Sequence, residues 1–103
     1  MAAYGASKAA VGSLTRSRGV DWSRHGVLVN AIAPGVFRTQ INAELLDHTD
    51  RGREFLTRTP VGRFGRAEDA VEAAVYLASD AASFVAGQII TVDGGFLSSG
   101  VNC

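Results

Sequence analysis

The stretch that most constrains the fold of this chain is residues 27–33, VLVNAIA, which is apolar on both faces and rich in β-branched side chains. Such a run is typical of a strand buried inside a parallel sheet. Pro34-Gly35 follows it and predicts a turn. One further run, QIITVD at residues 88–93, predicts a second strand. A buried strand with one predicted neighbour leaves its other edge open as a template for another chain.

Residues 4–24 predict a long helix that ends at His25-Gly26. Its predicted packing arc consists of three apolar side chains, Val11, Leu14 and Trp22. Two residues do not fit the pattern. Arg18 points into the same arc. An unpaired charge buried there would cost about 3 kcal/mol, unless the side chain reaches outward. Gly19 lies in the helix interior, where glycine costs about 1 kcal/mol relative to alanine.

The rest of the chain predicts a lobe, a helix and the second strand. The more polar residues 36–65 include two short predicted helices, near Ala43–Leu46 and Arg51–Thr57. The helix predicted at residues 67–79 has its apolar positions at i, i+3, i+4 and i+7, namely Val71, Ala74, Val75 and Ala78. The order of helix, strand, lobe, helix and strand predicts an α/β fold, with Asn30 as a structural hydrogen-bonding residue in the first strand.

Charge and hydropathy exclude several classes of partner. Ten basic residues balance ten acidic ones without a basic block, which argues against a nucleic-acid partner. No apolar run approaches 18 residues and the N-terminus lacks a signal-like pattern, so we expect no membrane partner and a cytoplasmic location. No His, Cys and Asp cluster has metal-ligand spacing, so we expect no metal site.

The pentad YGASK places Tyr4 and Lys8 four residues apart, on one face of the first predicted helix. A phenol, with a pKa of about 10, is a poor acid–base catalyst at neutral pH. An ammonium group one turn away stabilises the phenolate and makes the pair a candidate general acid/base. The alternative is a surface tyrosine beside a solvated lysine, and the pentad alone does not decide between the two.

Three motifs together resemble the short-chain dehydrogenase/reductase family. YGASK matches its Tyr-x-x-x-Lys motif, VNAIAPG at residues 29–35 with Thr39 matches the strand and turn after the catalytic helix, and residues 87–95 match the closing strand. The resemblance covers essentially all 103 residues and implies the C-terminal portion of a doubly wound, Rossmann-like domain with two parallel strands. It divides the chain into a catalytic helix (1–26), a strand and Pro-Gly turn (27–35), a substrate lobe (36–66), and a last helix, strand and tail (67–103).

The resemblance implies NAD- or NADP-dependent hydride transfer between a secondary alcohol and a ketone. Tyr4 would exchange the proton with a small-molecule substrate, and Lys8 would tune Tyr4 and hydrogen-bond the nicotinamide ribose. The implied cofactor-binding residues are Tyr4, Lys8, Pro34, Gly35, Val36 and Thr39. The implied substrate-facing residues are Phe37, Arg38, Gln40 and Ile41. For Arg38, binding of a substrate anion and simple solvation both stay open. Within the family, the motifs TPVGRFG and VDGGFLSSGV look most like those of the branch that reduces sugar-acid ketones or 3-oxoacyl thioesters.

The family carries a glycine-rich phosphate loop, a catalytic serine and an asparagine upstream of the tyrosine. None of the twelve glycines in this sequence forms such a loop. We therefore expect a C-terminal fragment that is inactive alone. The alternative is a non-catalytic half-domain that binds or oligomerises. Either way we expect a homo-oligomer or pairing through the exposed strand edge.

Overall fold

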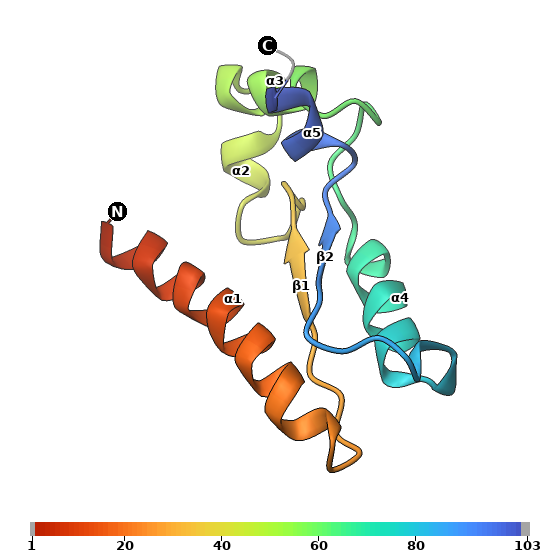
Figure 1. Cartoon of the computed structure of the whole chain (residues 1–103). Helices are drawn as coiled ribbons and strands as arrows, with labels where there is room; N and C mark the ends of the chain where they lie inside the picture. The colour runs from red at the N-terminus through yellow and green to blue at the C-terminus, as the bar shows by residue number, and fades with distance from the viewer. Residues whose placement is uncertain (1, 102–103) are drawn as a thin grey trace. The chain divides into compact units, whose positions relative to one another are not determined.

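The structure is a computed structural model that describes residues 2–101. Its elements follow one another in an α/β order (Figure 1). They are α1 (Ala2–Ser23), β1 (Ala31–Pro34), α2 (Ala43–Leu46), α3 (Asp50–Thr57), α4 (Ala67–Ala78), the 3-10 helix η1 (Asp80–Ala82), β2 (Ile89–Val92) and α5 (Phe96–Val101). The predicted fold class is confirmed, and α2 and α3 lie where the sequence predicts them. The helix α5 was not predicted.

The two strands form one parallel sheet of order β1–β2. The Ala31 N–H donates to the Gln88 carbonyl at 2.9 Å, and four residues later the Gly35 N–H donates to the Val92 carbonyl at 2.9 Å. The strand β1 begins later than the predicted run 27–33. The reason is that β2 begins only at Ile89 and offers the residues before Ala31 no partner in the sheet. Asn30 bridges this region as a structural residue: its amide donates to the Val85 carbonyl and its oxygen accepts from the Gln88 N–H, both at 3.0 Å.

The chain divides into two compact units: residues 1–32 with 75–90, and residues 33–74 with 91–103. Few apolar side chains are buried in either. Among the described residues only Leu46 and Ala82 are buried apolar side chains, whereas Val71, Val75 and Phe84 are exposed. A chain of this length with so small a core is marginally stable. No helix within residues 2–101 combines the length and apolar character needed to cross a bilayer.

In the first unit, α1 packs through small residues. An ideal Cβ at Gly19 would lie 2.3 Å from the Gly87 Cα, so the two backbones touch. On the same side, Thr15 is buried and a Cβ at Gly12 would lie 3.3 Å from the Ile89 Cδ1. This contact explains Gly19, since glycine is the residue that allows backbones to approach so closely.

The prediction that Val11, Leu14 and Trp22 form the packing face of α1 is wrong, because all three are exposed. The helix turns an adjacent arc toward residues 87–89, where the close approach leaves no room for large side chains. Arg18 takes the outward alternative. Its guanidinium is exposed, lies 3.9 Å from Asp21 and stands 5.5 Å from the centre of the Trp22 ring. It is therefore not a buried unpaired charge.

In the second unit, the loop after α3 is tied to the turn after β2. The Val61 N–H donates to the Gly94 carbonyl at 3.1 Å, and Gly94 and Gly95 both have positive φ. Pro60 lies against Gly95, where an added Cβ would come within 3.0 Å of the proline ring. The buried Thr59 donates its hydroxyl to the Phe55 carbonyl at 2.7 Å. The two sequence motifs TPVGRFG and VDGG thus build one local structure.

The contact between α1 and Gly87 predicts opposite effects for two alanine substitutions in one helix. Gly19→Ala forces a methyl into the Gly87 backbone and should lower the free energy of unfolding by about 1–3 kcal/mol. Gly5→Ala is the matched control, because nothing lies within 4 Å of the added methyl, and it should raise that free energy by about 0.5–1 kcal/mol. Urea unfolding followed by circular dichroism measures both. Equal stabilities of the two variants would contradict the observed packing.

Candidate functional site

The Tyr4–Lys8 pair lies on the first two turns of α1. The Lys8 Nζ stands 5.4 Å from the centre of the Tyr4 ring, as the i, i+4 spacing predicts. Tyr4 is 62% exposed, and its hydroxyl makes no hydrogen bond within the described part of the chain. Ser7, inside the same pentad, donates its hydroxyl hydrogen to the Tyr4 carbonyl at 2.7 Å. The phenol and the ammonium are therefore neighbours, and both are available to a ligand.

The Pro34-Gly35 turn leaves β1 against the end of β2. An ideal Cβ at Gly35 would lie 2.6 Å from the Asp93 Cβ and 2.7 Å from its Cα. Any side chain at position 35 would collide with Asp93, so glycine is required there by space. The carboxyl ends of both strands therefore meet at this turn, which is the edge where open α/β sheets bind ligands.

The segment after the turn pairs with Gly65. The Val36 carbonyl accepts the Gly65 N–H at 2.9 Å, and the Arg38 N–H donates to the Gly65 carbonyl at 3.0 Å. Phe37 and Gly65 form a parallel bridge. Within residues 2–101 the Val36 N–H donates to no group. An unpaired backbone donor at the carboxyl end of a strand is available to a bound ligand.

Asn42 braces the next turn, a role that was not among those predicted from the sequence. Its Oδ1 accepts the Thr39 N–H at 2.7 Å, and its Nδ2 donates to the Phe37 carbonyl at 2.8 Å. Its own N–H donates to the Thr39 Oγ1 at 3.4 Å. The spacing Thr-x-x-Asn directly before a short predicted helix was the available signal, because such spacings mark reciprocal side-chain and main-chain bonds at helix starts.

Arg38 is neither free nor simply solvated. It forms a bidentate pair with Asp47, with Nε–Oδ1 at 2.9 Å and Nη2–Oδ2 at 2.7 Å. The hydrogen bond from Arg38 lowers the pKa of Asp47, and the same bond raises the pKa of Arg38. A substrate anion at Arg38 would have to compete with this carboxylate. The neighbouring Gln40 and Ile41 are exposed, and Phe37 is half-buried.

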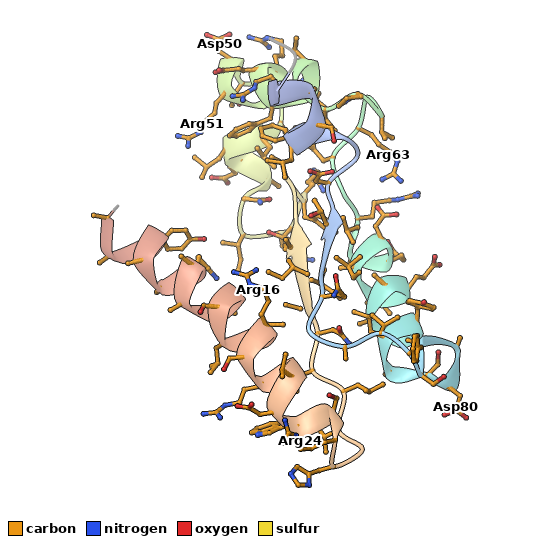
Figure 2. The ribbon with its side chains drawn as sticks, in the orientation of Figure 1. Arg16, Arg24, Asp50, Arg51, Arg63 and Asp80 are labelled. Atoms are coloured by element: carbon orange, nitrogen blue, oxygen red, sulfur yellow. The ribbon has the colours of Figure 1, made fainter. Side chains whose placement is uncertain are left out.

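A cavity of about 180 Å³ opens in the second unit beside the ends of β1 and β2. It is lined by Val36, Phe37, Val61, Arg63, Gly65, Asp69, Val92, Asp93 and Gly94. Arg63, labelled in Figure 2 on the loop before α4, pairs with Asp69 at 2.8 Å. That hydrogen bond, with one from the Arg66 N–H, lowers the pKa of Asp69 to about 2. The charges of Arg63 and Asp69 therefore compensate each other.

The predicted site residues fall into two sets. Tyr4 and Lys8 belong to one compact unit, and Pro34 through Gln40 belong to the other. Within each set the structure brings the members together, through the helix in the first and through the turn braced by Gly65 and Asn42 in the second. The described residues contain no group of three or more His, Cys, Asp or Glu side chains that could hold a metal ion.

Comparison with known proteins gives consistent matches. A family model described as Enoyl-(Acyl carrier protein) reductase matches residues 1–97. Gluconate 5-dehydrogenase of Gluconobacter oxydans (strain 621H) is 44% identical over 99 residues, which are 96% of this chain and 39% of the relative. The 2-dehydro-3-deoxy-D-gluconate 5-dehydrogenase of Bacillus subtilis (strain 168) is 47% identical over 96 residues, which are 93% of this chain and 38% of the relative.

Solved structures give the same result. A gluconate 5-dehydrogenase from Burkholderia cenocepacia J2315, in complex with NADP and tartrate, matches with a TM-score of 0.85 and 43% identity over 92% of this chain and 37% of that one. A short-chain type dehydrogenase/reductase from Mycobacterium ulcerans matches with a TM-score of 0.89 and 40% identity over 93% of this chain and 35% of that one. The chain thus spans about two fifths of the length of its relatives.

The Arg63–Asp69 pair predicts a specific acid sensitivity. The folded pKa of Asp69, about 2, lies below its ordinary value of 3.8, so the pair contributes stability above about pH 4 that is lost as pH falls through 2. Asp69→Asn should therefore flatten the dependence of unfolding free energy on pH between 4 and 2. Urea unfolding at each pH measures it. Glu68→Gln, at an exposed carboxylate without an ion pair in residues 2–101, is the control, and an unchanged slope in Asp69→Asn would contradict the assignment.

Proposed function

Because the chain belongs to the short-chain dehydrogenase/reductase family, we propose that it supplies the proton-transfer and nicotinamide-facing part of an NAD(P)-dependent oxidoreductase. The reaction interconverts a secondary alcohol and a ketone. The observation that carries the proposal is the Tyr4–Lys8 pair, with an exposed phenol whose hydroxyl has no partner in the described chain and an ammonium one turn away. A surface pair without a function would not need the matching turn and closing strand that accompany it.

In this proposal Tyr4 moves the proton. During reduction its hydroxyl donates a proton to the carbonyl oxygen of the substrate, and during oxidation its phenolate accepts the proton of the alcohol. Lys8 stabilises the phenolate by its positive charge. The nicotinamide cofactor, when bound, supplies or accepts the hydride. The protein residues therefore handle the proton and the orientation of the reactants.

The residues after β1 fit a nicotinamide carboxamide. The Val36 N–H has no partner within the described residues, and the Thr39 hydroxyl accepts from the Asn42 N–H, which leaves its own hydrogen free to donate. Gly35 lets the chain pass directly against Asp93 and so fixes where these donors leave the sheet. With Pro34 fixing the end of the strand, these groups would hold the carboxamide, and Lys8 would hold the ribose.

We propose a polyhydroxy acid as the substrate. Both curated relatives described above are named as dehydrogenases of gluconate or a 2-dehydro-3-deoxy-gluconate, and the NADP complex from Burkholderia cenocepacia also holds tartrate, a hydroxy acid. Phe37 and Gln40 would face it. Arg38 would contribute only after release of Asp47, and so it supports the substrate assignment less than its charge suggests. The reaction is placed in the cytoplasm as part of the same proposal.

These residues span about two fifths of the length of a relative such as the Gluconobacter oxydans enzyme, and we assign the activity to a protein of that whole length. The cofactor's phosphates need a glycine-rich loop, which none of the twelve glycines here provides. We therefore expect hydride transfer only when the remaining portion of the fold is present.

A fusion tests the proposal. The part of Gluconobacter oxydans gluconate 5-dehydrogenase that precedes its matched region is joined to this chain, and oxidation of NADPH and NADH is followed with 5-dehydrogluconate. The fusion should be active, and Tyr4→Phe should lower kcat by about 10²–10⁴ because the proton donor is lost. Tyr76→Phe, at the only other tyrosine, is the matched control and should leave kcat unchanged. An inactive fusion, or equal rates for Tyr4→Phe and the parent, would refute the proposal.

A second candidate function is a non-catalytic half-domain that oligomerises. The observation that favours it is the exposed apolar surface on α4, Val71 and Val75, together with the short two-stranded sheet.

This candidate predicts a stable oligomer of the 103-residue chain whose mass is unchanged by Tyr4→Phe. Replacing both exposed valines, in Val71→Lys with Val75→Lys, should dissociate it because like charges would meet at a formerly apolar contact. Sedimentation velocity measures the mass, and Glu72→Lys on the same helix is the control for added charge. A monodisperse monomer of the parent chain would eliminate this candidate.

A further inference from the structure

Asn42 has an unusual use for its side chain. It is the residue directly before α2, where an asparagine ordinarily accepts a hydrogen bond from the first turn of the helix. In this chain the Asn42 side chain makes no such cap. Both of its polar atoms bind residues that precede it in the chain. The Oδ1 accepts from the Thr39 N–H at 2.7 Å, and the Nδ2 donates to the Phe37 carbonyl at 2.8 Å. The side chain therefore stabilises the segment that precedes the helix.

Two braces hold alternate groups of this segment. Gly65 binds the Val36 carbonyl and the Arg38 N–H, and Asn42 binds the Phe37 carbonyl and the Thr39 N–H. Neither brace uses the Val36 N–H or the hydrogen of the Thr39 hydroxyl. The Asn42 N–H also reaches the Thr39 Oγ1 at 3.4 Å, so the oxygen accepts this bond and its own hydrogen is left free to donate. The segment is thus fixed while two of its donors are left available.

We propose that Asn42 is a positioning residue for cofactor binding. Its side chain holds the main chain of Phe37–Thr39, which carries the Thr39 hydroxyl, in the arrangement that receives the nicotinamide carboxamide. Preset donors bind a ligand without the cost of ordering a loop. This inference rests on the proposed function for the identity of the ligand, but the bracing itself rests on the observed hydrogen bonds alone.

The first measurement is amide hydrogen exchange by NMR on the 103-residue chain. The Thr39 amide should exchange slowly in the parent and at least tenfold faster in Asn42→Ala, which removes its acceptor. Asn42→Asp keeps an oxygen for the Thr39 N–H and loses the donor to Phe37, so it should retain most of the protection. Thr49→Ala is the matched control, because it removes a comparable bond, from the Gly52 N–H at 3.0 Å, elsewhere in the same unit. Equal exchange at Thr39 in the parent and Asn42→Ala would overturn the bracing.

The second measurement uses the fusion with the Gluconobacter oxydans portion. Asn42→Ala should raise the KM for NADPH about tenfold and lower kcat, because the nicotinamide carboxamide is no longer held in the position that hydride transfer requires. Asn42→Asp should restore part of both, and Thr49→Ala should change neither while lowering the melting temperature. Unchanged kinetics in Asn42→Ala would overturn the role in cofactor binding. An inactive parent fusion would refute the proposed function and with it the cofactor assignment, whereas the exchange result would still decide whether Asn42 holds the segment.

Discussion

The parallel pairing of β1 and β2 is the interaction on which the second unit depends. Its last rung, from the Gly35 N–H to the Val92 carbonyl, brings Gly35 against Asp93. Asp93 then uses its carboxylate to accept the Gly95 and Leu97 N–H groups, both at 2.9 Å, and so starts α5. The same rung fixes where residues 36–39 leave the sheet. A shift of this register would displace both loops at the carboxyl edge together.

The sequence predicts the parts of the fold that depend on periodicity. The α/β order, the positions of α2 and α3, and membership of the family were foreseen, because apolar spacing and three ordered motifs are readable without coordinates. The packing face of α1 was not. Apolar side chains indicate a packing face only when the partner surface leaves room for them, and the backbone at Gly87 leaves none. Which side of α1 packs depends on the path of residues 87–89, and the helix sequence does not encode that path.

The candidate site divides in the same way. Tyr4 and Lys8 could be paired from the sequence because helical geometry alone brings positions i and i+4 together. The bracing by Asn42 and the capture of Arg38 by Asp47 depend on the path of a loop, and no periodic pattern encodes such a path. Local hydrogen bonds of short polar side chains are the features that single-sequence reasoning most easily overlooks. The catalytic and binding roles of these residues stay predictions.

The contact between Gly19 and Gly87 has a consequence for how such proteins diversify. The two residues are far apart in the sequence, yet the volume beside one is occupied by the backbone of the other, and Gly87 also has a φ of +70°. A recombined gene that joined the first helix of one relative to the closing strand of another would combine a helix and a strand whose surfaces at positions 19 and 87 had not been matched to each other. The helix and the strand are therefore expected to be exchanged as one block during evolution, with the lobe between them free to vary.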